Sequence, residues 1–93
     1  MKIIKILPSF ERSLKKLSSQ DKEKLKKSLR QLNDFLTSGI LPAGLGFKKI
    51  NHNKYELRVD IHLRVIVKIE SNFVYLVLVG NHNDLKRFLR VYK

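Results

Sequence analysis

Residues 55–80, "YELRVDIHLRVIVKIESNFVYLVLVG", decide the fold class, because apolar and charged side chains alternate along them with a period of two. One face of the predicted strands is apolar and the other carries ions. The apolar positions are Leu57, Val59, Ile61, Leu63, Val65, Val67 and Ile69, and the ionic positions are Glu56, Arg58, Asp60, Arg64 and Lys68. Residues 73–79, "FVYLVLV", are apolar on both faces, which is typical of a central strand covered on each side.

Turn residues divide this part of the chain into an antiparallel meander. "FKKI", residues 47–50, meets the first of these strands across "NHNK", residues 51–54, and the chain bends again at residues 60–62 and 71–72. Each connection is short. Neighbouring segments are therefore expected to pair with one another in chain order.

The first forty residues show a different period. A short β-branched segment, residues 2–6, predicts a strand that Pro8 ends. Ser9 is then expected to cap a helix over about residues 9–17, in which apolar residues recur at helical spacing.

A longer helix is predicted over about residues 19–37. Ser18, with Asp21 three residues later, approximates a capping box, and Gly39 marks the end of the helix. The short connection at residue 18 makes the two helices near-antiparallel neighbours with a lysine-rich outer face. This face is most simply solvated, with an RNA or lipid surface as the alternative.

A third helix is expected from about Asp84 to the end of the chain, after the turn "GNHN" at residues 80–83. Its apolar positions are Leu85, Phe88, Leu89 and Tyr92. The "ILPAGLG" segment, residues 40–46, is the linker between helices and meander. We therefore predict a single α+β domain over residues 1–93: an N-terminal strand and a helical hairpin packed on the meander, with a short C-terminal helix.

Composition sets limits on function. The chain has 20 Lys and Arg against 8 Asp and Glu, a formal charge of +12, which points to a polyanionic partner. Nucleic acid is the commonest such partner, and an acidic protein or an anionic membrane surface are the alternatives. There is no cysteine, and the apolar run at the N-terminus is too short for a signal sequence or a membrane span, so a soluble cytoplasmic protein is expected.

The ionic face offers candidate chemistry. Arg58 and Arg64 lie on adjoining predicted strands, where their guanidiniums are suited to hold a phosphate, or equally to pair with Glu56 or Asp60. His82, in the turn that follows the sheet, is a candidate proton carrier, although a solvated turn histidine is the commoner case. We expect these three basic side chains to meet in one hollow.

Other candidates are weaker. Asp84 is better explained as a helix cap than as a base, and Phe88 as a core residue than as a platform for a nucleobase. The three histidines, at 52, 62 and 82, have no metal-ligand spacing. No metal or other cofactor is expected.

Four segments in this order resemble the RelE/ParE superfamily of type II toxins across essentially all of the chain. They are "SFERSLKKLSSQDKEKLKKSLRQL", "LPAGLGFKKI", "YELRVDIHLRVIVKIE" and "YLVLVGNHNDLKRFLR". The resemblance implies an mRNA endoribonuclease that acts in the ribosome without metal, by driving the ribose 2′-hydroxyl onto the adjacent phosphate. It also implies a neutralising antitoxin, acidic or amphipathic. A ParE-like gyrase inhibitor and a non-toxic basic relative that binds antitoxin or nucleic acid are the alternatives.

Carried onto this chain, the resemblance makes Arg64 the arginine that contacts the scissile phosphate, with Arg58 beside it and His82 as the basic residue after the last strand. Glu56 becomes a possible general base. The residues expected to contact RNA are Lys48, Lys49, Lys54, Arg87 and Phe88. Phe88 falls near the place of a tyrosine in some nucleases and cannot transfer a proton, and Tyr92 would substitute only if the helix end turned inward.

Overall fold

The computed structural model describes residues 2–91, in which eight elements follow one another in the predicted order. They are β1 (Ile3–Ile6), α1 (Pro8–Leu14), α2 (Ser19–Ser38), β2 (Gly46–Lys49), β3 (Lys54–Arg58), β4 (Arg64–Glu70), β5 (Phe73–Gly80) and α3 (His82–Val91). Tyr92, expected on the last helix, lies outside the described residues. The α+β prediction is confirmed, and residues 2–91 include no helix long and apolar enough to cross a membrane.

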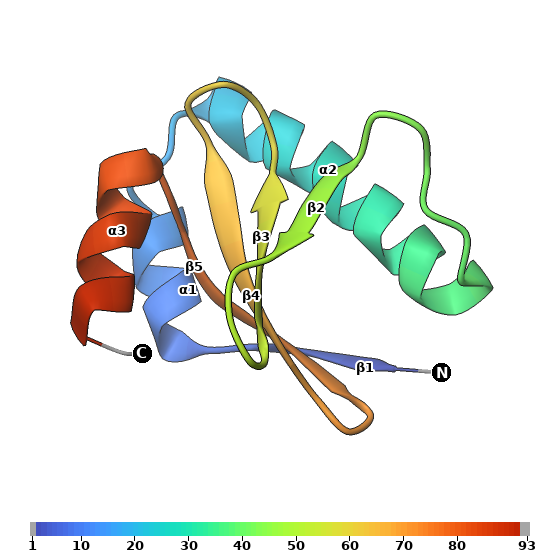
Figure 1. Cartoon of the computed structure of the whole chain (residues 1–93). Coiled ribbons are helices and arrows are strands. Elements are labelled where there is room, and N and C mark those ends of the chain that lie inside the picture. The colour runs from blue at the N-terminus through green and yellow to red at the C-terminus, as the bar shows by residue number, and fades with distance from the viewer. Residues whose placement is uncertain (1, 92–93) are drawn as a thin grey trace.

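The five strands form one mixed sheet in the order β1-β5-β4-β3-β2. Strands β2 to β5 are the predicted antiparallel meander, and β1 adds to it by pairing parallel to β5, Ile3 opposite Phe73 and Ile6 opposite Leu76. Figure 1 shows β1 running beside the β4–β5 hairpin. This pairing joins segments about seventy residues apart in the sequence, so no local sequence pattern predicts it.

The helices bury the two faces of the sheet unequally. Helices α1 and α2 cover the face that carries Leu57, Val65 and Val74, and Phe10, Leu25 and Leu32 complete that core. Helix α3 covers only part of the other face, where Leu85 packs with Ile66 and Val77. The rest of this second face, which we call the open face, carries charged side chains on β2, β3 and β4.

Helix α2 keeps its predicted caps. The Ser18 hydroxyl accepts the Asp21 backbone N–H at 3.1 Å, and Gly39 ends the helix with φ of 78°. Lys24 on this helix pairs with Asp60 of the β3–β4 loop at 3.0 Å. This pairing lowers the pKa of Asp60 and raises that of Lys24.

Ser9 does not cap α1. The N-cap is Leu7, with Pro8 at the first helical position, where its missing N–H is not needed. The Ser9 hydroxyl instead donates to the Val77 carbonyl at 2.5 Å, and the Ser13 hydroxyl accepts the Val79 N–H at 3.1 Å. The two serines thus satisfy backbone groups of β5 beyond the point where β1 ends, and α1 ends earlier than predicted, at Leu14.

The β3–β4 connection also corrects one apolar position. The Asp60 carboxylate accepts the backbone N–H groups of His62 and Leu63 at 2.8 and 2.7 Å, which closes a tight loop. Ile61 lies in this loop and is 67% exposed, so it belongs to no core face. The local turn chemistry overrides the alternation at this point.

Candidate anion site on the open face

Two arginines lie directly opposite each other at one end of the open face. In the sheet register, Gly46 faces Arg58, Arg58 faces Arg64, and Arg64 faces Gly80. We call these four residues the arginine row. Opposed Cα atoms in antiparallel strands are about 5 Å apart, so the two arginine side chains leave the backbone close to each other.

The glycines at the ends of the row leave space for the arginines and for the next helix. A Cβ on Gly46 would lie 3.0 Å from the Cβ of Arg58, which is closer than ordinary contact. A Cβ on Gly80 would lie 2.7 Å from a carboxylate oxygen of Asp84. A larger side chain is therefore excluded at Gly80 unless Asp84 moves and is tightly packed at Gly46, and the place of both glycines beside the arginines could not be read from the sequence.

Glu56 provides a buried carboxylate next to the row. Its Oε2 accepts a hydrogen bond from Arg64 Nη1 at 3.2 Å and lies 3.7 Å from Lys48 Nζ. The Glu56 side chain is 10% exposed and that of Arg64 is 19% exposed. Of the salt bridges expected for the two arginines, only this one is present; Asp60 pairs with Lys24 instead.

These side chains line one hollow of about 360 Å³. Its lining residues are Leu45, Gly46, Phe47, Lys48, Glu56, Arg58 and Arg64. Arg58 is exposed and has no ion-pair partner among the described residues, and the buried Nε of Arg64 has no hydrogen-bond partner there either. Unused guanidinium donors around one carboxylate make a site for an anion with oxygen acceptors, such as a phosphate.

His82 does not join this hollow. It is the first residue of α3, it is exposed, and it lines neither this hollow nor the second one described below. The expectation that both arginines and the imidazole meet in one hollow is therefore wrong for the imidazole. The helix begins two residues earlier than predicted, and this places His82 on its first turn.

Asn81, rather than Asn83 or Asp84, caps α3. Its side-chain oxygen accepts the Asp84 N–H at 2.9 Å, and the Asp84 carboxylate accepts the Asn81 N–H at 3.0 Å, a reciprocal capping box. Asp84 also pairs with Arg87. These contacts give Asp84 a structural role at the start of α3.

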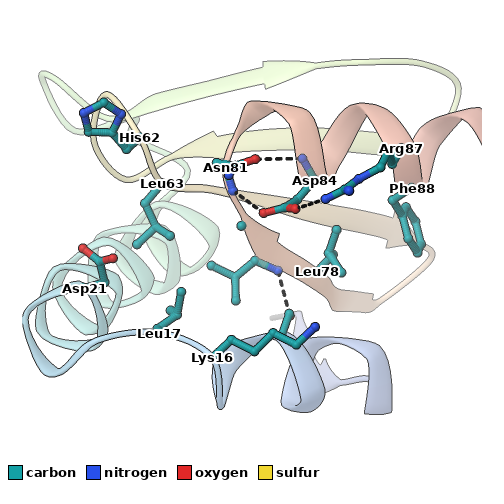
Figure 2. Close-up of a pocket in the computed structure, with 13 residues that line it drawn as sticks. Lys16, Leu17, Asp21, His62, Leu63, Leu78, Asn81, Asp84, Arg87 and Phe88 are labelled. Carbon is teal, nitrogen blue, oxygen red and sulfur yellow. Dashed lines mark hydrogen bonds and ion pairs between the residues drawn. The ribbon is translucent and has the colours of Figure 1, made fainter.

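Arg87 and Phe88 line a second hollow of about 460 Å³, between α3, the end of α1 and the β3–β4 loop. Figure 2 shows Lys16 on the α1 side and Arg87 and Phe88 on the α3 side, with Leu78 between them. Phe88 is half-buried and packs against the core that Leu85 belongs to. These two predicted RNA contacts thus line a different hollow from Arg58 and Arg64, although Gly80, at the end of the arginine row, also lines the second hollow.

The three predicted lysines divide between the faces of the sheet. Lys48 and Lys54 share the open face, since they are on the same side as Glu56 in the register. Lys49 is opposite Tyr55, on the face that α2 covers, although it is exposed. No group of three or more His, Cys, Asp or Glu side chains within residues 2–91 is arranged to hold a metal ion.

No family model and no curated protein match this chain significantly. Its fold does match solved structures. A chain of the RelB–RelE antitoxin–toxin complex from Methanococcus jannaschii superposes with a TM-score of 0.68 at 19% identity, covering 89% of this chain and 95% of that one. YafQ from E. coli gives a TM-score of 0.66 at 18% identity, with 91% and 98% covered.

The YoeB dimer from Staphylococcus aureus gives a TM-score of 0.65 at 19% identity, covering 87% of this chain and 97% of that one. The protein therefore has the fold of the RelE, YafQ and YoeB toxins of type II toxin–antitoxin systems, as its sequence led us to expect. The ParE alternative gains no support from these similarities.

Proposed function

We propose that this protein is the toxin of a type II toxin–antitoxin system and acts as a ribosome-dependent mRNA endoribonuclease. The observation that carries the proposal is the hollow in which Arg58, Arg64 and Glu56 meet on the open face of a RelE-like fold. RelE, YafQ and YoeB, the toxins with this fold, support the reaction class. The +12 charge suits a chain that works on RNA.

The two arginines hold the scissile phosphate. Their positions on adjacent strands restrict the side chains, so less ordering is lost on binding than for lysines on a helix. Charge accumulates on the phosphate oxygens as the reaction proceeds, and fixed guanidiniums stabilise that charge most where it develops. Arg64 is already held by Glu56, and Arg58, which has no ion-pair partner within residues 2–91, is available to the substrate.

Glu56 accepts the proton of the ribose 2′-hydroxyl. The 2′-oxygen then attacks the neighbouring phosphorus, the bond from phosphorus to the 5′-oxygen breaks, and the products are a 2′,3′-cyclic phosphate and a 5′-hydroxyl end. What favours Glu56 is that its carboxylate lines the same hollow as both arginines. No metal is required by this balance of bonds and protons.

The leaving 5′-oxygen needs a proton, and His82 is the proposed donor. Its support is indirect: Gly80 is opposite Arg64, and α3 starts two residues later with His82 exposed to solvent. Phe88 cannot take this role because it carries no exchangeable proton. Cleavage at the wild-type rate without the imidazole would refute this role of His82.

An antitoxin and the ribosome are the proposed partners. Chains of similar fold are crystallised as the RelB–RelE and DinJ–YafQ toxin–antitoxin complexes. An acidic or amphipathic antitoxin would offset the charge of this chain, and the exposed Lys48 and Lys49 would contact ribosomal RNA.

Primer extension on ribosome-bound mRNA tests the proposal. We expect the wild-type chain to cleave, Arg64→Ala and Glu56→Gln to lose at least about 100-fold in rate, and His82→Gln to lose about 10- to 100-fold. Lys27→Ala, an exposed lysine on α2, is the matched control and should cleave normally. Intact mRNA with the wild-type chain would overturn the enzyme assignment.

A further inference from the structure

A second row of cations crosses the open face at the end away from the arginine row. Lys54 is opposite Lys68, Lys68 is opposite Tyr75, and Tyr75 is opposite Lys5 of the parallel strand β1. We call these four residues the lysine row. Lys5 belongs to it only because β1 joins the sheet beside β5, which brings together residues about seventy positions apart in the sequence.

Aromatic rings hold two of these ammonium groups in place. Lys5 Nζ lies 5.2 Å from the centre of the Phe73 ring, and Lys68 Nζ lies 5.7 Å from that of Tyr75. The two rings are 6.1 Å apart and half-buried. A lysine that rests on an aromatic face loses less side-chain freedom when it binds an anion than one that is fully mobile.

The charges of the row are only partly balanced. Lys68 pairs with Glu70 at 2.6 Å, whereas within residues 2–91 neither Lys5 nor Lys54 has an ion-pair partner. Lys54 and Lys68 are directly opposite each other, an arrangement that is unfavourable for like charges. A ligand with several negative charges would relieve this repulsion.

Both rows share one surface, which α3 leaves uncovered on β2 and β3. Lys54 precedes Arg58 by four residues on β3, so the rows are about 13 Å apart along the strand. Lys48 lies between them, opposite Glu56. A flexible polyanion that reaches the arginine row can continue along this path to the lysine row.

We propose that the lysine row is a second RNA contact, which binds the phosphodiester backbone of a single-stranded segment extending from the arginine row. This inference rests on the proposed function, since it takes the ligand of the arginine row to be RNA. It adds Lys5 and Lys68 to the residues that hold the substrate. The row supplies affinity and no chemistry, because none of its three lysines lines the hollow that holds Glu56.

Binding of 2′-O-methyl RNA, which has no free 2′-hydroxyl and cannot be cleaved, provides the test. Fluorescence anisotropy would compare a labelled dinucleotide with a labelled oligonucleotide of about twelve nucleotides over a range of salt concentrations. For the longer RNA, Lys5→Ala with Lys68→Ala should weaken binding about tenfold and make the log–log salt slope shallower by about 1.4, or 0.7 per lost phosphate contact.

Affinity for the dinucleotide, whose single phosphodiester can contact one row only, should change less than twofold in the double variant. Lys22→Ala with Lys27→Ala removes the same charge from exposed positions on α2 and should leave both affinities nearly unchanged. Circular dichroism melting confirms that each variant is folded. A double variant that keeps the wild-type affinity and salt slope, or a control that weakens binding equally, overturns the inference.

Results that refute the proposed nuclease function differ from results that refute the lysine row. If the wild-type chain cuts no mRNA, yet its binding of the longer RNA depends on Lys5 and Lys68, the lysine row stands and the nuclease does not. If cleavage depends on Arg64 while the lysine variants bind normally, the nuclease stands alone. A wild-type chain that binds the longer RNA no more tightly than the shorter one also overturns the inference.

Discussion

The two arginines of the arginine row are expected to affect stability in opposite directions, although the proposed function uses both to hold the substrate phosphate. Arg64 has a buried carboxylate partner, Glu56, at 3.2 Å, and its side chain is 19% exposed. Arg58 is exposed and faces Arg64 across the strands without an ion-pair partner among the described residues. Alanine at each position therefore removes a different kind of interaction.

Arg64→Ala leaves the Glu56 carboxylate with Lys48 alone, at 3.7 Å. Loss of one partner from a fully buried pair costs about 3–5 kcal/mol, and the partial exposure of Arg64 and the remaining lysine reduce our expectation to about 2 kcal/mol. Arg58→Ala removes an unfavourable opposition of like charges, and the free energy of unfolding should stay the same or rise by up to about 0.5 kcal/mol.

Urea unfolding followed by circular dichroism measures both changes. With a slope of about 1–2 kcal/mol per M for a chain of this size, the midpoint should fall by about 1–2 M for Arg64→Ala and should not fall for Arg58→Ala. Both variants should lose cleavage of ribosome-bound mRNA. The reasoning is refuted if Arg58→Ala destabilises the protein as much as Arg64→Ala does, because the arginines would then share one structural role.

Three further predictions concern the hydrogen bonds and backbone conformations that stabilise the fold. Ser13→Ala should lower the free energy of unfolding by about 1–3 kcal/mol in a urea titration, because the buried Val79 N–H loses its acceptor; an unchanged midpoint would contradict this. Gly39→Ala should cost about 1–2 kcal/mol in the same assay, since φ at this position is 78°, and Gly39→Asn should cost less. The pKa of Asp60 is lowered chiefly by the hydrogen bond from Lys24. The ionised Asp60 carboxylate therefore adds to the free energy of unfolding above pH about 4, and this contribution is lost as the pH falls through the folded-state pKa. Asp60→Asn should therefore reduce stability at pH 7 and flatten its decline between about pH 5 and pH 3, and a parallel decline in both proteins would refute this assignment.

Local patterns predicted the elements well where sequence neighbours decide the structure. The caps of α2 at Ser18 and Gly39 are present as expected, because a cap depends on residues three or four positions apart. The alternation in residues 55–80 gave the correct apolar face, with Leu57 and Val65 fully buried. The prediction that Ile61 lies on this apolar face was wrong, because two backbone hydrogen bonds to the Asp60 carboxylate form a loop that alternation alone cannot reveal.

The candidate site was predicted less completely. Its residue types were recognised, and Glu56 was expected both as a partner of arginine and as a possible base. The expected place of His82 was wrong, because a capping box between Asn81 and Asp84 starts the helix early and removes the imidazole from the hollow. The signal was available in "NHND", in which Asn and Asp stand three residues apart.

The sequence by itself determined which segments are helices and strands, which face of each is apolar, and that the chain carries a large excess of positive charge. Those properties depend on the types of side chain and their spacing, which can be read directly from the sequence. Only the tertiary structure decided that Arg58 and Arg64 face each other between two glycines, and that Lys5 joins Lys54 and Lys68. Such neighbours are set by strand register and by the parallel pairing of β1 with β5, which depend on how the whole core packs rather than on any local pattern.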